Sequence, residues 1–119
     1  MTKPHDPSAG PGSLTRIASW NVNSLKVRLP QLLEWLDSRA PDIVCLQETK
    51  LEDHSFPDTA LAELGYRSVF AGQKTYNGVA LLSRAPVGDV QVGITGFADE
   101  QMRVIAATAP LLRESMAEA

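Results

Sequence analysis

The sequence lacks several features that mark whole classes of protein. Its 119 residues include one cysteine, Cys45, which excludes a disulfide framework within the chain and fits a reducing compartment. The formal net charge is −3, so nucleic-acid binding through bulk positive charge is disfavoured, although a local site remains open. No apolar run is long enough to span a membrane, and the N-terminus has no signal-peptide pattern. From these absences we expect a cytoplasmic protein with no membrane partner and at most one domain.

The two ends of the chain differ in composition from the residues between them. Residues 1–14 are rich in proline, glycine and serine and offer little to bury, so we expect a disordered leader. Residues 15–108 carry the apolar patterns of alternating strands and helices, which predict an α/β fold. Residues 109–119 lose those patterns, and their apolar side chains give only a weak helical face.

The first half of the domain predicts a strand–helix–strand unit. Residues 16–20 and 42–47 are short, apolar and β-prone, as expected of buried strands. Pro30 fits the first turn of the helix between them, where its missing N–H costs nothing, and Pro41 ends that helix. A right-handed crossover would make the two strands parallel. Four leucines recur at helical spacing and predict a core-facing stripe, formed by Leu29, Leu32, Leu33 and Leu36.

The second strand ends abruptly in residues 47–50, whose sequence is Gln-Glu-Thr-Lys. Taken alone, Glu48 is most simply an ordinary solvated glutamate. However, Asn21 and Glu48 each lie at the carboxyl end of a strand, and parallel neighbours finish at the same edge of a sheet. The topology therefore predicts that these two side chains meet, at the edge where open α/β sheets bind their ligands.

The rest of the domain predicts one short helix and further strands. We expect a helix over residues 58–64, ended by Gly65, and antiparallel strands over 66–71 and 79–84. Asn77-Gly78, just before the second of these strands, is also what a simple hairpin turn would carry. Two later strands are expected, at residues 89–92 and 103–108.

Several of these segments together resemble the exonuclease III family of AP endonucleases, within the endonuclease/exonuclease/phosphatase superfamily. The segment Leu-Gln-Glu-Thr-Lys is specific for the superfamily, and Gly-Gln-Lys with Asn-Gly-Val-Ala-Leu-Leu-Ser-Arg narrows the resemblance to exonuclease III-like proteins. The resemblance implies a DNase I-like four-layer α/β sandwich, here only its N-terminal half, with strands for roughly one sheet. The segments that carry it are residues 19–25, 41–50, 64–66, 72–74 and 77–84.

The resemblance also implies a chemistry for the polar edge of the sheet. Family members use Mg²⁺ or Mn²⁺ to hydrolyse phosphodiesters in double-stranded DNA, at abasic sites and 3′ ends. Glu48 matches the family's metal-binding glutamate, and Asn21 matches its asparagine near the scissile phosphate and the metal. Hard divalent cations prefer such oxygen ligands.

Four more residues are implied as substrate contacts. Asn23 stands where some relatives carry an aspartate near the metal, and Lys50 lies beside Glu48 in the sequence. Lys74 and Asn77 match positions suited to DNA contact, although a solvated surface lysine is an equally ordinary explanation of Lys74.

The chain departs from the family after residue 108. The family's catalytic tyrosine, its Asp-x-Asn motif and its closing Asp-His pair have no counterpart there. We therefore expect a truncated chain that is inactive alone and is not a stable monomer: it should self-associate, aggregate or stay partly unfolded, whereas full-length relatives are expected to be monomers. Two alternatives stay open: another phosphodiesterase or phosphatase of the superfamily, and a remnant without catalysis.

Overall fold

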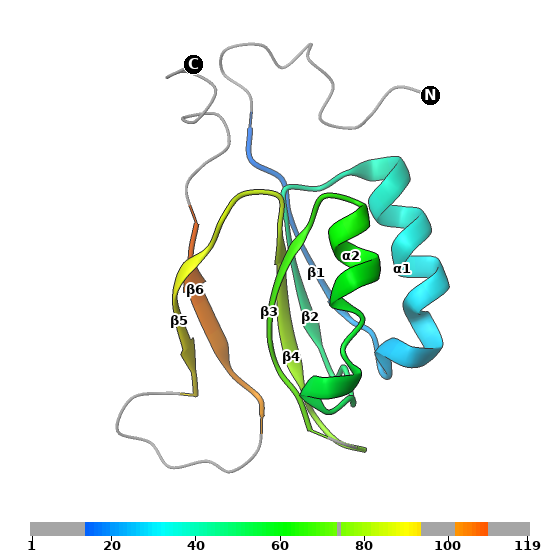
Figure 1. Ribbon diagram of the computed structural model, residues 1–119, viewed down its shortest axis with the longest axis vertical. Helices are drawn as coiled ribbons and strands as arrows, with labels where there is room; N and C mark the ends of the chain where they lie inside the picture. The colour runs from blue at the N-terminus through cyan, green and yellow to red at the C-terminus, as the bar shows by residue number, and fades with distance from the viewer. Residues whose placement is uncertain (1–13, 74, 94–101, 110–119) are drawn as a thin grey trace.

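The computed structural model describes residues 14–73, 75–93 and 102–109 (Figure 1). In the part of the chain so described, neither helix has the length and apolar character that crossing a membrane requires. The elements in chain order are β1 (Ile17–Asn21), α1 (Leu25–Arg39), β2 (Ile43–Gln47), the 3-10 turn η2 (Asp53–Ser55), α2 (Asp58–Glu63), β3 (Arg67–Ala71), β4 (Val79–Ser83), β5 (Gly88–Val92) and β6 (Ile105–Thr108).

Four strands form the main sheet in the order β1-β2-β4-β3. β1 and β2 are parallel, with Ile17 opposite Ile43 and Asn21 opposite Gln47, which confirms the predicted crossover unit. β3 and β4 are antiparallel, as the sequence also predicted. Because β1 and β2 run the same way and in register, their carboxyl ends finish at one edge of the sheet.

The hydrophobic core lies between this sheet and the two helices (Figure 1). Leu32 and Leu36 of α1 are buried, and Val44, Leu46 and Leu82 face them from the strands. Each fully buried aliphatic side chain contributes roughly 1.5–3 kcal/mol relative to an exposed one. The predicted leucine stripe is therefore the main apolar surface of α1, although its other two members, Leu29 and Leu33, are only partly buried.

The predicted start of α1 is wrong. The helix begins at Leu25, and Pro30 lies inside it rather than in its first turn. The cause is tertiary: the Ser24 and Leu25 N–H groups donate to the backbone carbonyls of Glu48 and Thr49, at 2.9 Å each. Those bonds satisfy donors that a helix start leaves unpaired, so the helix forms one turn earlier than its proline indicates.

The expectation of roughly one sheet is also wrong, because β5 and β6 pair with each other in a separate antiparallel sheet. Figure 1 shows this pair on the side of the main sheet opposite the helices. The layers are thus helices, four-stranded sheet and two-stranded sheet, in the order that a four-layer sandwich requires. β6 contacts β4, where Val79 is 7% exposed, whereas Ile17 on β1 is 65% exposed. The second sheet therefore covers only part of this face.

Candidate functional site

Three loops meet at the edge where β1 and β2 end. They follow β1, follow β2 and precede β4, and backbone hydrogen bonds join them. The Ser24 N–H donates to the Glu48 carbonyl at 2.9 Å, which joins the first two loops. The Thr49 and Lys50 N–H groups donate to the carbonyls of Gly78 and Asn77, at 3.1 and 2.9 Å. Segments far apart in sequence therefore form one continuous rim.

The predicted meeting of Asn21 and Glu48 is confirmed. The Asn21 side-chain Nδ2 donates to Glu48 Oε2 at 2.6 Å. The Asn21 Oδ1 accepts from the backbone N–H of Asn23 at 3.0 Å. Both ends of the amide are thus engaged, which fixes its rotation and holds the carboxylate of Glu48 above the end of β2.

Lys50 connects the same carboxylate to a second asparagine. Its Nζ donates to Asn23 Oδ1 at 2.6 Å and lies 3.8 Å from Glu48 Oε1. The side chains of Lys50 and Glu48 are 30% and 45% exposed, so this ion pair contributes at most about 1 kcal/mol to stability. What the contacts supply is order, since they link four polar side chains: Asn21, Glu48, Lys50 and Asn23.

The backbone of this rim is unusually rich in left-handed residues. Glu48 has a φ of 53° and Lys50 a φ of 57°, a region that most non-glycine residues avoid. Such conformations cost on the order of 1–3 kcal/mol each and concentrate at functional sites. Four further rim residues share a positive φ: Asn23, Ser24, Thr75 and Asn77.

Gly78 lets the third loop approach the second. Its φ is +92°, and a Cβ built there would lie 2.2 Å from Thr49 Oγ1. Asn77 and Gly78 are therefore not a two-residue hairpin turn: they end the longer connection from β3 to β4 and pack against the residues after Glu48. Sequence reasoning left these two explanations open.

A polar hollow of about 410 Å³ opens at the rim, lined by Glu48, Lys50, Tyr76 and Asn77. The aromatic ring of Tyr76, which is 66% exposed, was not anticipated from the sequence. The Gln73 Oε1 accepts from Asn77 Nδ2 at 3.4 Å and so helps to position Asn77. Lys74, the remaining predicted substrate contact, lies outside the described residues.

The donor chemistry of the rim suits a hard divalent cation held weakly. One carboxylate and neighbouring amide oxygens offer the oxygen ligands that Mg²⁺ takes while keeping several waters. Across residues 14–73, 75–93 and 102–109, no group of three or more His, Cys, Asp or Glu side chains is placed to hold a metal ion. This donor set does not fit Zn²⁺, which prefers closed nitrogen and sulfur cages.

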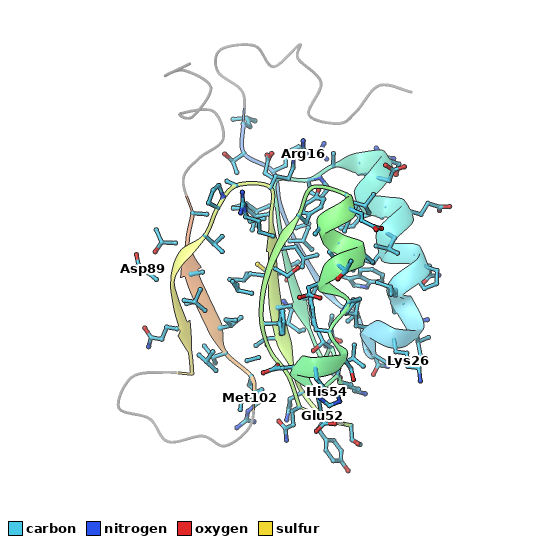
Figure 2. The ribbon with its side chains drawn as sticks, in the orientation of Figure 1. Arg16, Lys26, Glu52, His54, Asp89 and Met102 are labelled. Atoms are coloured by element: carbon cyan, nitrogen blue, oxygen red, sulfur yellow. The ribbon has the colours of Figure 1, made fainter. Side chains whose placement is uncertain are left out.

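Two other reactive residue types take no part in the contacts among Asn21, Asn23, Glu48 and Lys50. Figure 2 shows His54, with Glu52, at the end of the molecule where β2 finishes, and its side chain is exposed in η2. Burial raises the pKa of the Cys45 thiol, so this cysteine stays protonated and weakly nucleophilic at neutral pH. A second hollow, of about 470 Å³, borders β1 and α1, but no charged side chain lines it.

Residues 18–111 match the model of the endonuclease/exonuclease/phosphatase family. Exodeoxyribonuclease III of Haemophilus influenzae is 37% identical over 93 residues, which cover 77% of this chain. The chain spans only 35% of that relative's length.

Solved structures show the same likeness in three dimensions. The 3′ phosphatase NExo from Neisseria, bound to a product DNA hairpin, is 50% identical with a TM-score of 0.78, over 81% of this chain and 38% of that one. An AP endonuclease from Archaeoglobus fulgidus is 40% identical with a TM-score of 0.77, over 81% of this chain and 37% of that one. The predicted DNase I-like fold is confirmed for the part of the fold that this chain spans.

Proposed function

The chain belongs to the endonuclease/exonuclease/phosphatase family, and from that premise we propose that it is part of a DNA repair nuclease of exonuclease III type. The proposed reaction is metal-dependent hydrolysis of phosphodiesters in double-stranded DNA, at abasic sites and 3′ ends. The observation that carries the proposal is the Asn21–Glu48 pair, which two parallel strands deliver to one rim with a 2.6 Å hydrogen bond.

Glu48 and Asn21 are the proposed metal ligands, and Mg²⁺ or Mn²⁺ is the proposed cofactor. When bound, such a cation neutralises charge that develops on the phosphoryl and leaving oxygens. Asn21 holds the Glu48 carboxylate in place, and its neutral amide adds no charge that would repel a phosphate. Because one carboxylate is a small ligand set, the proposed affinity is low.

The substrate contacts of the proposal come from the rest of the rim. Lys50 supplies positive charge beside the metal ligand, and Asn23 and Asn77 supply amides that can donate to phosphate oxygens. Tyr76 adds an exposed ring at the hollow, of the kind that packs against nucleotides. Lys74 stays part of the proposal on its match to the family alone.

The proposal also states which residues form the family domain and in which cellular compartment the protein lies. Residues 15–108 would form the family portion, between a leader at 1–14 and a divergent end at 109–119. The cytoplasm is the proposed location, since Cys45 is free and would remain reduced there.

Removal of a 3′-terminal phosphate from DNA is a second candidate reaction. The NExo structure, half identical to this chain over the matched residues, is described as a 3′ phosphatase. The same metal and phosphate groups would serve either reaction, because both break a phosphoester bond beside a 3′ oxygen.

A chimera tests the proposal. Residues 16–108 would replace the matching segment of Haemophilus influenzae exodeoxyribonuclease III, and the product would be offered an abasic duplex and a 3′-phosphorylated duplex with Mg²⁺. We expect cleavage of at least one substrate, and its loss in Glu48→Gln. Glu34→Gln, at an exposed glutamate on α1 away from the three loops, is the matched control and should retain activity.

Two results would count against the proposal. One is a folded chimera with no activity on either DNA. The other is equal activity in Glu48→Gln and in the control.

Residues 1–119 alone should show no incision of either DNA. Each positioned acid–base group typically accelerates such a reaction by about 10²- to 10⁴-fold, and the family's acid–base groups have no counterpart after residue 108.

A further inference from the structure

The Lys50 ammonium lies beside the same rim oxygens that a bound divalent cation would need. It lies 3.8 Å from Glu48 Oε1, while the other carboxylate oxygen accepts from Asn21. Both oxygens of Glu48, the proposed carboxylate ligand, thus already face a positive or donor group. The Asn23 Oδ1, another hard oxygen of the rim, is occupied by the same ammonium at 2.6 Å.

We propose that Lys50 is the resident counter-ion of this site and that it sets the metal affinity by competing with the divalent cation for Glu48 and Asn23. The inference rests on the proposed function, since it assumes that Glu48 binds metal. It assigns Lys50 a positioning and regulatory role: it neutralises the carboxylate when no metal is bound, and metal entry requires the ammonium to withdraw.

The backbone explains why the ammonium is held here. Glu48 and Lys50 both have left-handed backbone conformations, and Thr49 between them is buried. The Lys50 N–H is also fixed by the Asn77 carbonyl at 2.9 Å. The lysine therefore starts from a fixed backbone position, with its side chain returned toward Glu48 and Asn23.

The physical consequence is a penalty on cation binding. Two positive groups that share one carboxylate repel each other, and in a partly exposed site this repulsion is modest and screened by salt. Removing the ammonium should tighten Mn²⁺ binding by about tenfold, and the gain should shrink at high ionic strength.

Mn²⁺ titration of residues 1–119, followed by electron paramagnetic resonance of the free ion, provides the test. Lys50→Met and Lys50→Gln both remove the charge, and the glutamine keeps a donor for Asn23, so the two variants together separate charge from hydrogen bonding. Lys50→Arg retains the charge and should bind like the wild type. Lys26→Met, at an exposed lysine outside the network, controls for the general loss of one positive charge.

The inference is supported if both neutral variants of Lys50 tighten binding and the control variant at Lys26 does not. It is overturned if either Lys50→Met or Lys50→Gln binds Mn²⁺ no tighter than the wild type, or if Lys26→Met tightens binding equally. Glu48→Gln distinguishes this failure from a failure of the proposed function. If Glu48→Gln abolishes binding while the Lys50 variants have no effect, only the role of Lys50 is wrong; unchanged binding in Glu48→Gln overturns both.

Discussion

Single residues at the rim show how closely its loops are packed. Gly78 has a φ of +92°, and its Cα lies against the side chain of Thr49, which is 1% exposed. A Cβ would force either the loop before β4 or the loop after β2 to move. The residue thus couples the backbone of the third loop to the position of Glu48, without carrying any functional group.

Replacing this glycine should destabilise the protein. We expect Gly78→Ala to lower the free energy of unfolding by about 2 kcal/mol or more, through the left-handed φ and the clash with Thr49 together. Gly88→Ala is the matched control, because nothing lies within 4 Å of a Cβ built at Gly88. Urea denaturation of both variants measures the difference; equal stability would mean that the loops are not packed as described.

At the scale of elements, the sequence predicted those features that local pattern determines. The short apolar, β-prone runs at residues 16–20 and 42–47 and the leucine stripe between them sufficed to predict a parallel crossover unit, and so the Asn21–Glu48 contact. Features that depend on distant backbone partners were not predictable. Glu48 and Lys50 carry no sequence signal for a left-handed backbone, and nothing near Leu25 reveals the carbonyls that start α1.

The start of α1 leads to a prediction about Pro30. This proline lies inside the helix, where it removes one backbone hydrogen bond, although its exposed position lets water reach the freed carbonyl. Pro30→Ala should therefore stabilise the protein by about 1–2 kcal/mol, after allowing for the greater freedom of the unfolded chain. Gln31→Ala, at the next exposed helical position, should change stability by less than about 0.5 kcal/mol. Thermal or urea unfolding that shows a loss of stability in Pro30→Ala would contradict the observed helix start.

At the scale of the whole molecule, one face of the main sheet is unevenly covered. β5–β6 lies over the β4 side, while β1 stands at the edge of the sheet with Ile17 65% exposed. Ile17 points away from the helices, because side chains alternate along a strand and Ala18 and Trp20 lie opposite Val44 and Leu46 of β2, which belong to the core beneath the helices. An apolar side chain on an open sheet edge is a site of association.

We predict that residues 1–119 self-associate through this face. Ile17→Lys should shift the chain toward monomer in sedimentation velocity, because a charge on an edge strand opposes pairing. Val27→Lys is the control, since Val27 is 61% exposed but lies on α1, on the other side of the sheet. A monomeric wild type with a sharp, cooperative melt would show that the open face is tolerated and that this prediction is wrong.

The central claim is that three loops form one divalent-cation site around Glu48. Backbone amide spectra of isotope-labelled protein, recorded during a Mn²⁺ titration, test it most directly, because the paramagnetic ion broadens only nearby signals. We predict selective broadening of residues 21–24, 48–50 and 75–78 together, at sub-stoichiometric Mn²⁺, and its loss in Glu48→Gln. Broadening confined to other acidic residues, such as Asp58 or Glu63, or broadening of the three loops that persists in Glu48→Gln, would contradict the account.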